Sequence, residues 1–185
     1  MVELSGFDVV SRIISEEGRL CTFRKGSPMR SEQEVNRAIE QYADMVFRLC
    51  MVNLKNQADA EDIFQTVFLK YTLYSKTFDS PAHEKAWLIR VTLNACRDLL
   101  KSFFRKNTVS LEEAVSLISP EHSAVLEAVW SLPKDYRDVV YLHYYEGYTA
   151  PEIAAILKKN PNTVYTHLTR ARNMLKDILG GEADE

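Results

Sequence analysis

The sequence has few of the residues that build disulfide frameworks or metal sites, and it has no long apolar segment. Its three cysteines, Cys21, Cys50 and Cys96, are odd in number and far apart, and no CxxC pair or cysteine–histidine cluster accompanies them. Neither a disulfide framework nor a zinc site is therefore expected. No apolar run approaches the roughly 18 residues of a membrane span, and the N-terminus lacks the apolar block of a signal peptide. We expect a cytoplasmic protein without membrane insertion.

The chain also lacks the motifs of the common enzyme classes. It has no Gly-rich phosphate loop, no cluster of metal ligands and no recognisable nucleophile–base motif. We therefore predict that it is not an enzyme, that it has no catalytic or metal-binding residues, and that it needs no cofactor. Alternating strand patterns, internal repeats and low-complexity blocks are also missing, so the whole chain is predicted to be α-helical.

The length, composition and net charge of the chain limit where a nucleic acid could bind. A chain of 185 residues with 46% hydrophobic content can bury the core of one large domain or of two small ones. The formal net charge of -3 excludes a surface that is basic everywhere. Nucleic-acid binding would therefore require local basic patches.

Apolar spacing predicts two helical domains. Residues 1–30 read as a poorly defined extension in which Met29 is an alternative start, and residues 31–106 as a first bundle of three helices. The second of these helices should bury Ile63, Val67, Phe68 and Tyr71, and the third, from Glu84, should bury Trp87, Leu88, Val91, Ala95, Leu99 and Phe103. Residues 107–122 read as a flexible linker, 123–179 as a second helical domain and 180–185 as an acidic tail.

Two short helices near the C-terminus are predicted to form a helix-turn-helix. Thr149 and Glu152 have the spacing of a capping box at the start of the first helix. Asn160 can cap the second, with Pro161 at its first position, where the missing N–H has no cost. The short connection between these helices is typical of the motif.

The second helix of this motif is basic and suits DNA. Between Lys158 and Lys176 the cations are Lys158, Lys159, Arg170, Arg172 and Lys176, and there is no acid. In a helix-turn-helix the second helix enters the major groove. Its core side would hold Val164, Leu168, Ala171 and Leu175, which leaves for solvent or DNA Thr163, Tyr165, Thr166, His167, Thr169, Arg170 and Arg172. The alternative interpretation is a solvated helix face.

The first bundle has one basic helix and one acidic region. In the third helix, Arg90, Asn94, Arg97 and Lys101 recur at steps of three and four, which suits phosphate contact and stacking with unpaired bases. From Ser31 to Thr66 seven acids outnumber three bases, so a protein partner is expected there. The acids are Glu32, Glu34, Glu40, Asp44, Asp59, Glu61 and Asp62, and the bases are Arg37, Arg48 and Lys55. The alternative for the basic face and for the acidic region is that each is simply exposed to solvent and binds no partner.

Three segments, in order, resemble the extracytoplasmic-function (ECF) sigma factors of bacterial RNA polymerase. They are "DAEDIFQTVFLKY", "AWLIRVTLNACRDLLK" and "LPKDYRDVVYLHYYEGYTAPEIAAILKKNPNTVYTHLTRARNML". The resemblance runs from about Glu34 to Leu179. It implies two helical domains, called two and four, joined by a flexible linker, and a function in promoter-specific transcription initiation.

The resemblance also implies partners and site residues. It places the polymerase-core interface on Asp59, Glu61, Asp62, Gln65 and Phe68. It assigns minus-ten promoter contacts to Lys85, Arg90, Asn94, Arg97 and Lys101, and minus-thirty-five contacts to Thr163, Tyr165, Thr166, His167, Arg170 and Arg172. An anti-sigma factor is a further candidate partner.

The chain departs from the family pattern at some of these positions. The family often has a cation or serine where Tyr165, Thr166 and His167 stand, and the loop "DSPAHEKA" lacks the usual arginines. The alternative functions are a free-standing helix-turn-helix regulator that binds DNA without polymerase, and a helical adaptor that never touches DNA.

Overall fold

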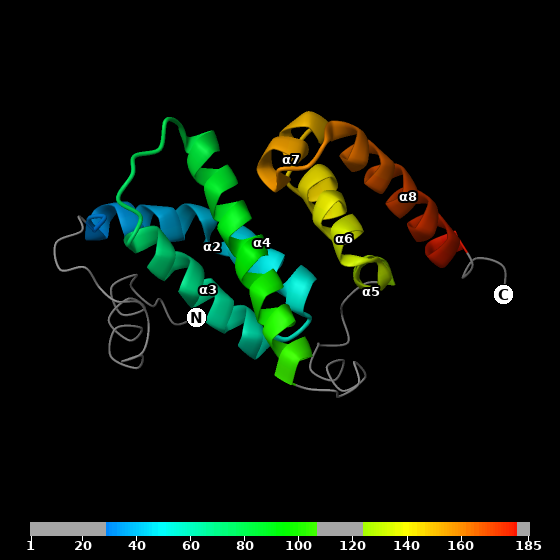
Figure 1. Ribbon diagram of the computed structural model, residues 1–185, viewed down its shortest axis with the longest axis horizontal. Coiled ribbons are helices and arrows are strands. Elements are labelled where there is room, and N and C mark those ends of the chain that lie inside the picture. The colour runs from blue at the N-terminus through cyan, green and yellow to red at the C-terminus, as the bar shows by residue number, and fades with distance from the viewer. Residues whose placement is uncertain (1–28, 107–123, 181–185) are drawn as a thin grey trace. The chain divides into compact units, whose positions relative to one another are not determined.

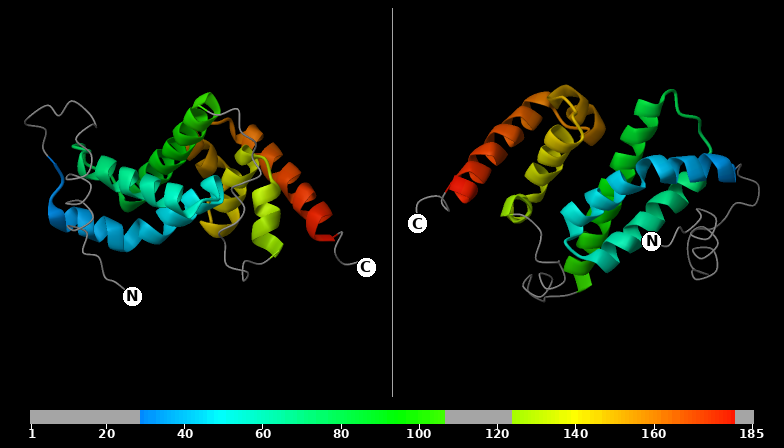
Figure 2. Two further views of the ribbon diagram at one scale, coloured as in Figure 1. Left: turned by 90° about the horizontal axis from the view of Figure 1, so that it is seen from below. Right: turned by 180° about the vertical axis from the view of Figure 1, so that it is seen from behind.

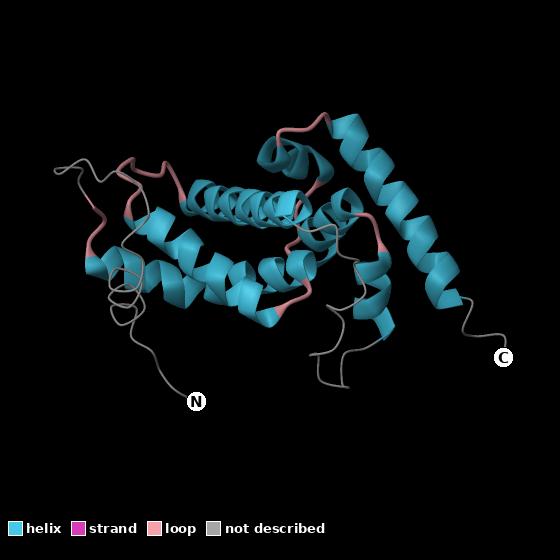
Figure 3. Cartoon of the chain, turned by 60° about the horizontal axis from the view of Figure 1, so that its bottom comes forward, coloured by secondary structure: helices cyan, strands magenta, loops and turns pink. Residues whose placement is uncertain are grey.

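The described chain is helical throughout. The computed structural model describes residues 29–106 and 124–180. In order, these residues form α2 (Glu32–Leu54), α3 (Gln57–Thr72), α4 (Pro81–Lys106), α5 (Ala124–Ser131), α6 (Lys134–Val140), the π-helix η2 (Tyr141–Tyr145), α7 (Ala150–Leu157) and α8 (Pro161–Gly180) (Figure 1). Within these two ranges there is no strand (Figure 3), and the prediction of an all-α fold is confirmed. The expectations for the extension, the linker and the tail fall almost wholly outside the described residues.

The chain divides into two compact units. Of the described residues, the first unit holds 29–50 and 58–99, and the second holds 51–57, 100–106 and 124–180. Helices α2, α3 and α4 lie side by side in every view of the first unit (Figure 2). In the second unit α8 packs against α5, α6 and α7. None of the described helices is long and apolar enough to cross a bilayer.

The core of the first unit includes the predicted side of α3. Val67, Phe68 and Tyr71 are fully buried, and Ile63 is nearly so. On α4 the prediction was only partly right. Leu88 and Ala95 are buried as expected, but Trp87, Val91 and Leu99 are half-buried, and the core positions are completed by Ile89, Thr92, Leu93 and Cys96. The buried face of α4 is therefore rotated away from Trp87, whose ring packs within a group of aromatic side chains. The side chain of Phe103 lies outside the described part.

Helix α4 begins three residues earlier than predicted. Pro81 is the first residue of the helix, whereas the sequence predicts a start at Glu84. The hydroxyl of Ser80 accepts a hydrogen bond from the His83 N–H at 3.1 Å and so caps the helix. A proline at the first helical position has no missing hydrogen bond, because that N–H would have no intrahelical partner.

The second unit contains a π-helix that the sequence did not predict. In the sequence, the segment "KDYRDVVYLHYYEG", residues 134–147, has the pattern of one helix. Instead the Glu146 N–H donates to the Tyr141 carbonyl at 3.2 Å, five residues back, and Gly147 ends the turn with φ +76. Such turns often occur at functional sites. Here the extra residue leaves Tyr144 and Tyr145 more than half exposed.

Candidate nucleic-acid and protein-binding surfaces

Both predicted caps of the helix-turn-helix are present. At α7, the carboxylate of Glu152 accepts hydrogen bonds from the Thr149 N–H at 2.8 Å and from the Thr149 hydroxyl at 2.6 Å. At α8, the side-chain oxygen of Asn160 accepts the Asn162 N–H at 2.8 Å. Between the helices Lys158 adopts the left-handed conformation, φ 53, and ends α7. These local contacts fix where α7 ends and α8 begins.

Helix α8 presents most of the predicted DNA-binding residues to solvent. Its buried side consists of Val164, Leu168 and Ala171, while Leu175 is half-buried. The exposed predicted residues are Thr163, Tyr165, Thr166, Arg170 and Arg172. The guanidinium of Arg172 is oriented by the π-helix, since its Nε donates to the Tyr144 hydroxyl at 3.1 Å. Thr163, Thr166 and Arg170 share the outer face of α8, whereas Arg172 lies two positions after Arg170, about 200° around the helix, on the same side as Tyr165.

His167 differs from its neighbours. It is half-buried, and its ring lies 5.0 Å from that of Tyr136 on α6. Burial lowers its pKa, as do the nearby charges of Lys159 and Arg170, and the opposing effect of Asp135 is smaller. His167 therefore loses its proton more readily than an ordinary histidine, and one side of its ring packs against Tyr136 of α6.

Four of the five predicted minus-ten residues share one face of α4. Arg90, Asn94, Arg97 and Lys101 follow Trp87 at steps of three and four, and we call these five residues the basic stripe. Arg97 donates to the side-chain oxygen of Asn94 at 2.9 Å. Lys85 does not belong to this face, because it precedes Trp87 by two positions, about 200° around the helix. Its charge instead acts on Tyr42 of α2.

An aromatic cluster adjoins the first residue of the basic stripe. Trp87 lies 4.6 Å from the ring of Tyr74, 5.6 Å from Phe78 and 6.2 Å from Tyr71. Tyr74 and Phe78 belong to the α3–α4 loop, residues 73–80. These loop aromatics were not among the predicted site residues. Their spacing in "YTLYSKTF" was the available signal.

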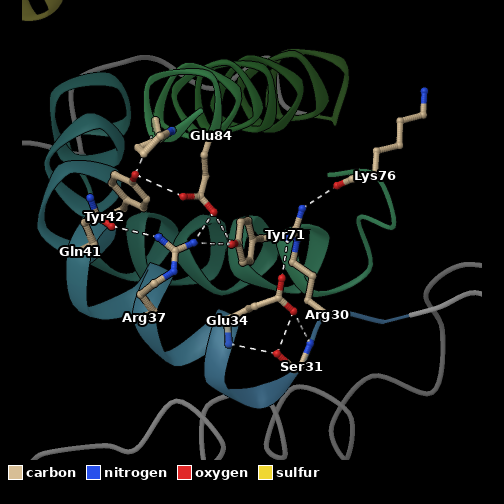
Figure 4. A network of polar contacts seen from close by, with 10 residues as sticks. Arg30, Ser31, Glu34, Arg37, Gln41, Tyr42, Tyr71, Lys76 and Glu84 are labelled. Carbon is tan, nitrogen blue, oxygen red and sulfur yellow. Dashed lines mark hydrogen bonds and ion pairs between the residues drawn. The ribbon is translucent and has the colours of Figure 1, made fainter. Parts of the chain in front are cut away.

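A buried carboxylate connects the three helices of the first unit (Figure 4). Glu84 of α4 is 4% exposed. It accepts hydrogen bonds from Arg37 of α2 at 2.7 Å, from Tyr42 of α2 at 3.3 Å and from the Tyr71 hydroxyl of α3. Burial by itself raises the pKa of Glu84, but the hydrogen bonds from Arg37 and Tyr71 and the charge of Arg37 outweigh it, so the pKa lies below its usual value.

The start of α3 forms an acidic surface, and Phe68 is not part of it. Glu61, Asp62 and Gln65 are exposed and Asp59 is half-buried. Burial raises the pKa of Asp59, and the neighbouring charge of Asp62 raises it further. A cationic partner would relieve this repulsion. Phe68, by contrast, is 0% exposed in the core, so its side chain is not available to a partner, and we remove it from the predicted interface.

Comparisons with known proteins match both units. The family model "Sigma-70 region 2" matches residues 38–106, and "Sigma-70, region 4" matches residues 122–175. The RNA polymerase sigma factor SigV of Bacillus subtilis is 30% identical over 142 residues, which cover 74% of this chain and 85% of SigV. The chain belongs to the ECF sigma factors of bacterial RNA polymerase. The resemblance in the sequence is confirmed.

A further relative agrees with this assignment, and two solved structures share the fold. The ECF sigma factor SigE of Mycolicibacterium smegmatis is 30% identical over 160 residues, 80% of this chain, which spans 62% of the length of SigE. The fold of the sigma factor RpoE of Bartonella quintana matches with a TM-score of 0.67 at 20% identity, over 83% of this chain and 99% of that one. The fold of CnrH matches with a TM-score of 0.60 at 19% identity, over 98% of this chain and 99% of that one.

The family gives this sigma factor its general role. It acts with RNA polymerase in transcription initiation at promoters, and the alternative of a free-standing regulator is not favoured. Sigma factors are in general non-enzymatic regulators of transcription.

Proposed function

We propose that this sigma factor reads promoter DNA with two separate helices, α8 for the minus-thirty-five element and α4 for the minus-ten element, and binds core polymerase through the start of α3. The observation that carries this proposal is the doubly capped α7–α8 pair, which presents Thr163, Thr166 and Arg170 on the side of α8 opposite its buried residues. In helix-turn-helix proteins the corresponding face lies in the major groove.

The basic stripe supplies the minus-ten contacts in this proposal. Arg90, Arg97 and Lys101 provide positive charge for phosphates, and Asn94 provides an amide that can bind a base edge. The aromatic cluster beside Trp87 offers ring surface close by. Lys85 is not included, because it lies on another side of α4.

The two DNA surfaces, on α4 and on α8, act together when both engage one promoter. The effective concentration of the second contact is then set by the connection between the units. We assign residues 31–106 to domain two, 107–122 to the linker and 123–179 to domain four. Catalysis remains with the polymerase, and the sigma factor works in the cytoplasm. The RpoE structure contains the anti-sigma factor NepR, which supports an inhibitor of this kind as a candidate partner.

Promoter-library transcription tests the proposal as a whole. Run-off transcripts are measured with core polymerase in the presence and absence of the full-length sigma factor. Promoter-specific initiation that depends on the added protein, with a shared sequence at both elements, is the expected result. If core gains no specificity and the protein alone binds a palindromic duplex, the protein is a free-standing regulator.

The substitution Asp62→Ala is expected to weaken core binding without changing promoter preference. Asp62 is exposed at the start of α3, so its loss should leave the fold intact while removing one attractive charge. We expect a loss of roughly tenfold in affinity, about 1.4 kcal/mol. Competition between labelled sigma factors for core measures this, and Asp98→Ala, an exposed acid on α4, is the control. Unchanged core affinity would remove Asp62 from the interface.

The substitution Arg170→Ala is expected to weaken promoter binding by the holoenzyme. A cation that contacts a base contributes about 1–3 kcal/mol to promoter binding. If Arg170 contacts a phosphate, its loss lowers the steepness of the plot of log affinity against log salt concentration by about one. Holoenzyme affinity for a promoter duplex is measured over a salt series. Lys176→Ala, which removes another exposed cation nearer the end of α8, should have a smaller effect. If the Arg170→Ala holoenzyme gave the same DNA footprint and the same promoter affinity as the natural protein, Arg170 would be excluded from the minus-thirty-five site.

A further inference from the structure

Arg30 occupies the aromatic cluster of the first unit. It precedes α2, and its side chain is only 10% exposed. The centre of its guanidinium lies 4.7 Å from the ring centroid of Tyr71 and 4.7 Å from that of Phe78, and 5.9 Å from that of Tyr74. A cation over aromatic faces at these distances is attracted by the ring quadrupoles. One arginine thus contacts the end of α3 and two aromatic residues of the α3–α4 loop.

Hydrogen bonds hold Arg30 in this place (Figure 4). Its Nη2 donates to the Lys76 carbonyl of the loop at 2.7 Å, and its backbone N–H donates to the Thr72 carbonyl at 3.0 Å. Its Nη1 pairs with Glu34 at 3.3 Å. Hydrogen bonds from the backbone and hydroxyl of Ser31 lower the pKa of Glu34, so this partner is charged at neutral pH. The start of α2 is therefore tied to the loop by a charge-assisted contact.

The loop that Arg30 holds is in contact with the basic stripe. Tyr74 and Phe78 both pack on Trp87, the first residue of the stripe. Without Arg30, Phe78 would keep its ring neighbours, but the Lys76 carbonyl would lose its charged donor. The loop would then sample more arrangements beside the residues that meet the unpaired DNA strand.

We propose that Arg30 is a positioning residue for the minus-ten contact: it fixes the α3–α4 loop against Trp87, so that the basic stripe and the loop meet the opened strand in one geometry. This inference rests on the proposed function of α4. Arg30 itself need not touch DNA, core polymerase or α8. Its loss should therefore slow promoter opening and relax minus-ten discrimination, while core affinity and minus-thirty-five binding stay near those of the natural protein.

The test compares three substitutions in the full-length protein assembled with core polymerase. Arg30→Met keeps the length of the side chain but removes the charge and all its donors. Arg30→Lys keeps a cation and a donor for the Lys76 carbonyl but lacks the planar group between the rings. Arg48→Met is the control, since Arg48 forms an exposed ion pair with Asp44 on α2. Permanganate reactivity of unpaired thymines follows promoter opening, and core affinity, duplex affinity and thermal unfolding are measured on the same proteins.

We expect Arg30→Met to slow opening by roughly tenfold, Arg30→Lys to restore part of the rate, and Arg48→Met to behave as the natural protein. Phe78→Leu, which removes the ring from the loop side of the same contact, should reproduce the selective defect even if Arg30→Met unfolds. Opening at the natural rate for Arg30→Met and Phe78→Leu would overturn the inference. So would a parallel loss of core affinity, duplex affinity and opening, because that pattern indicates a merely structural role.

The substitution Arg97→Ala separates this inference from the proposed function. If Arg97→Ala slows opening and the Arg30 variants do not, the basic stripe reads the minus-ten element and Arg30 has no part in it. If Arg97→Ala leaves opening unchanged, the stripe is wrongly assigned, and the positioning role of Arg30 falls with it.

Discussion

Replacing Phe68 by alanine is expected to destabilise the first unit by about 3–5 kcal/mol, the usual cost of removing a buried aromatic ring. Phe68 is 0% exposed, and its ring centroid lies 4.9 Å from that of Phe64 on the same helix. Truncation would leave a cavity among α2, α3 and α4. Because small domains are stable by only about 5–15 kcal/mol, this loss is a large part of the total.

The Phe68 variant distinguishes a core role from an interface role. Urea unfolding of the full-length protein, followed by Trp87 and Trp130 fluorescence, gives the stability, and competition for core polymerase gives the affinity. Gln65→Ala, one turn earlier and exposed, is the matched control and should keep the natural stability. An unchanged urea midpoint together with a large loss of core affinity for Phe68→Ala would return Phe68 to the interface.

Features fixed by neighbouring residues could be predicted from the sequence. The capping box of Thr149 and Glu152 and the cap of Asn160 depend on contacts within three residues, so the spacing of the residue types was sufficient. The apolar period of α3 predicted its buried side for the same reason. These local signals were enough to place the helix-turn-helix and its exposed basic face.

Features that depend on tertiary contacts were missed or assigned wrongly. Phe68 was expected in the core by its spacing and at an interface by the family resemblance, and only its burial decides between them. Lys85 is a different case, because helix periodicity alone, a local property of the sequence, places it on another side of α4 than Trp87. The contacts of Arg30 with Lys76 and of Glu84 with Arg37 join residues 46 and 47 positions apart, and no local sequence pattern predicts such pairs.

The π-helix is a further case in which tertiary packing overrides a local pattern. The apolar and aromatic residues of "YLHYY" fit a regular helix, and nothing in their spacing marks an extra residue. In the structure this turn brings the Tyr144 hydroxyl to Arg172, 28 residues later in the chain. A long-range contact of this kind determines how one of the predicted DNA-binding side chains is held.

The stability of the first unit should depend on acid pH through Glu84. The folded pKa of this carboxyl lies below its ordinary value of 4.5. A depressed pKa means that the charged form stabilises the fold fully above the unfolded value and that this contribution is lost as the pH falls through the folded value. Acidification below about pH 4.5 should therefore progressively weaken the link among α2, α3 and α4.

The substitution Glu84→Gln is expected to lower the free energy of unfolding at pH 7 by about 1.5–3 kcal/mol, because hydrogen bonds to a charged group contribute about that much. Glutamine keeps the size of the side chain, and its carbonyl oxygen can still accept from Arg37 and Tyr71, but the substitution removes the negative charge that attracts Arg37 and places an amide donor where Tyr42 donates. Urea unfolding between pH 3 and pH 8 should show the difference between the natural protein and the variant narrowing toward acid. Glu40→Gln, an exposed position on α2, is the control. A difference that stays constant across this range would mean that the charge of Glu84 does not stabilise the bundle and that its burial is tolerated for shape alone.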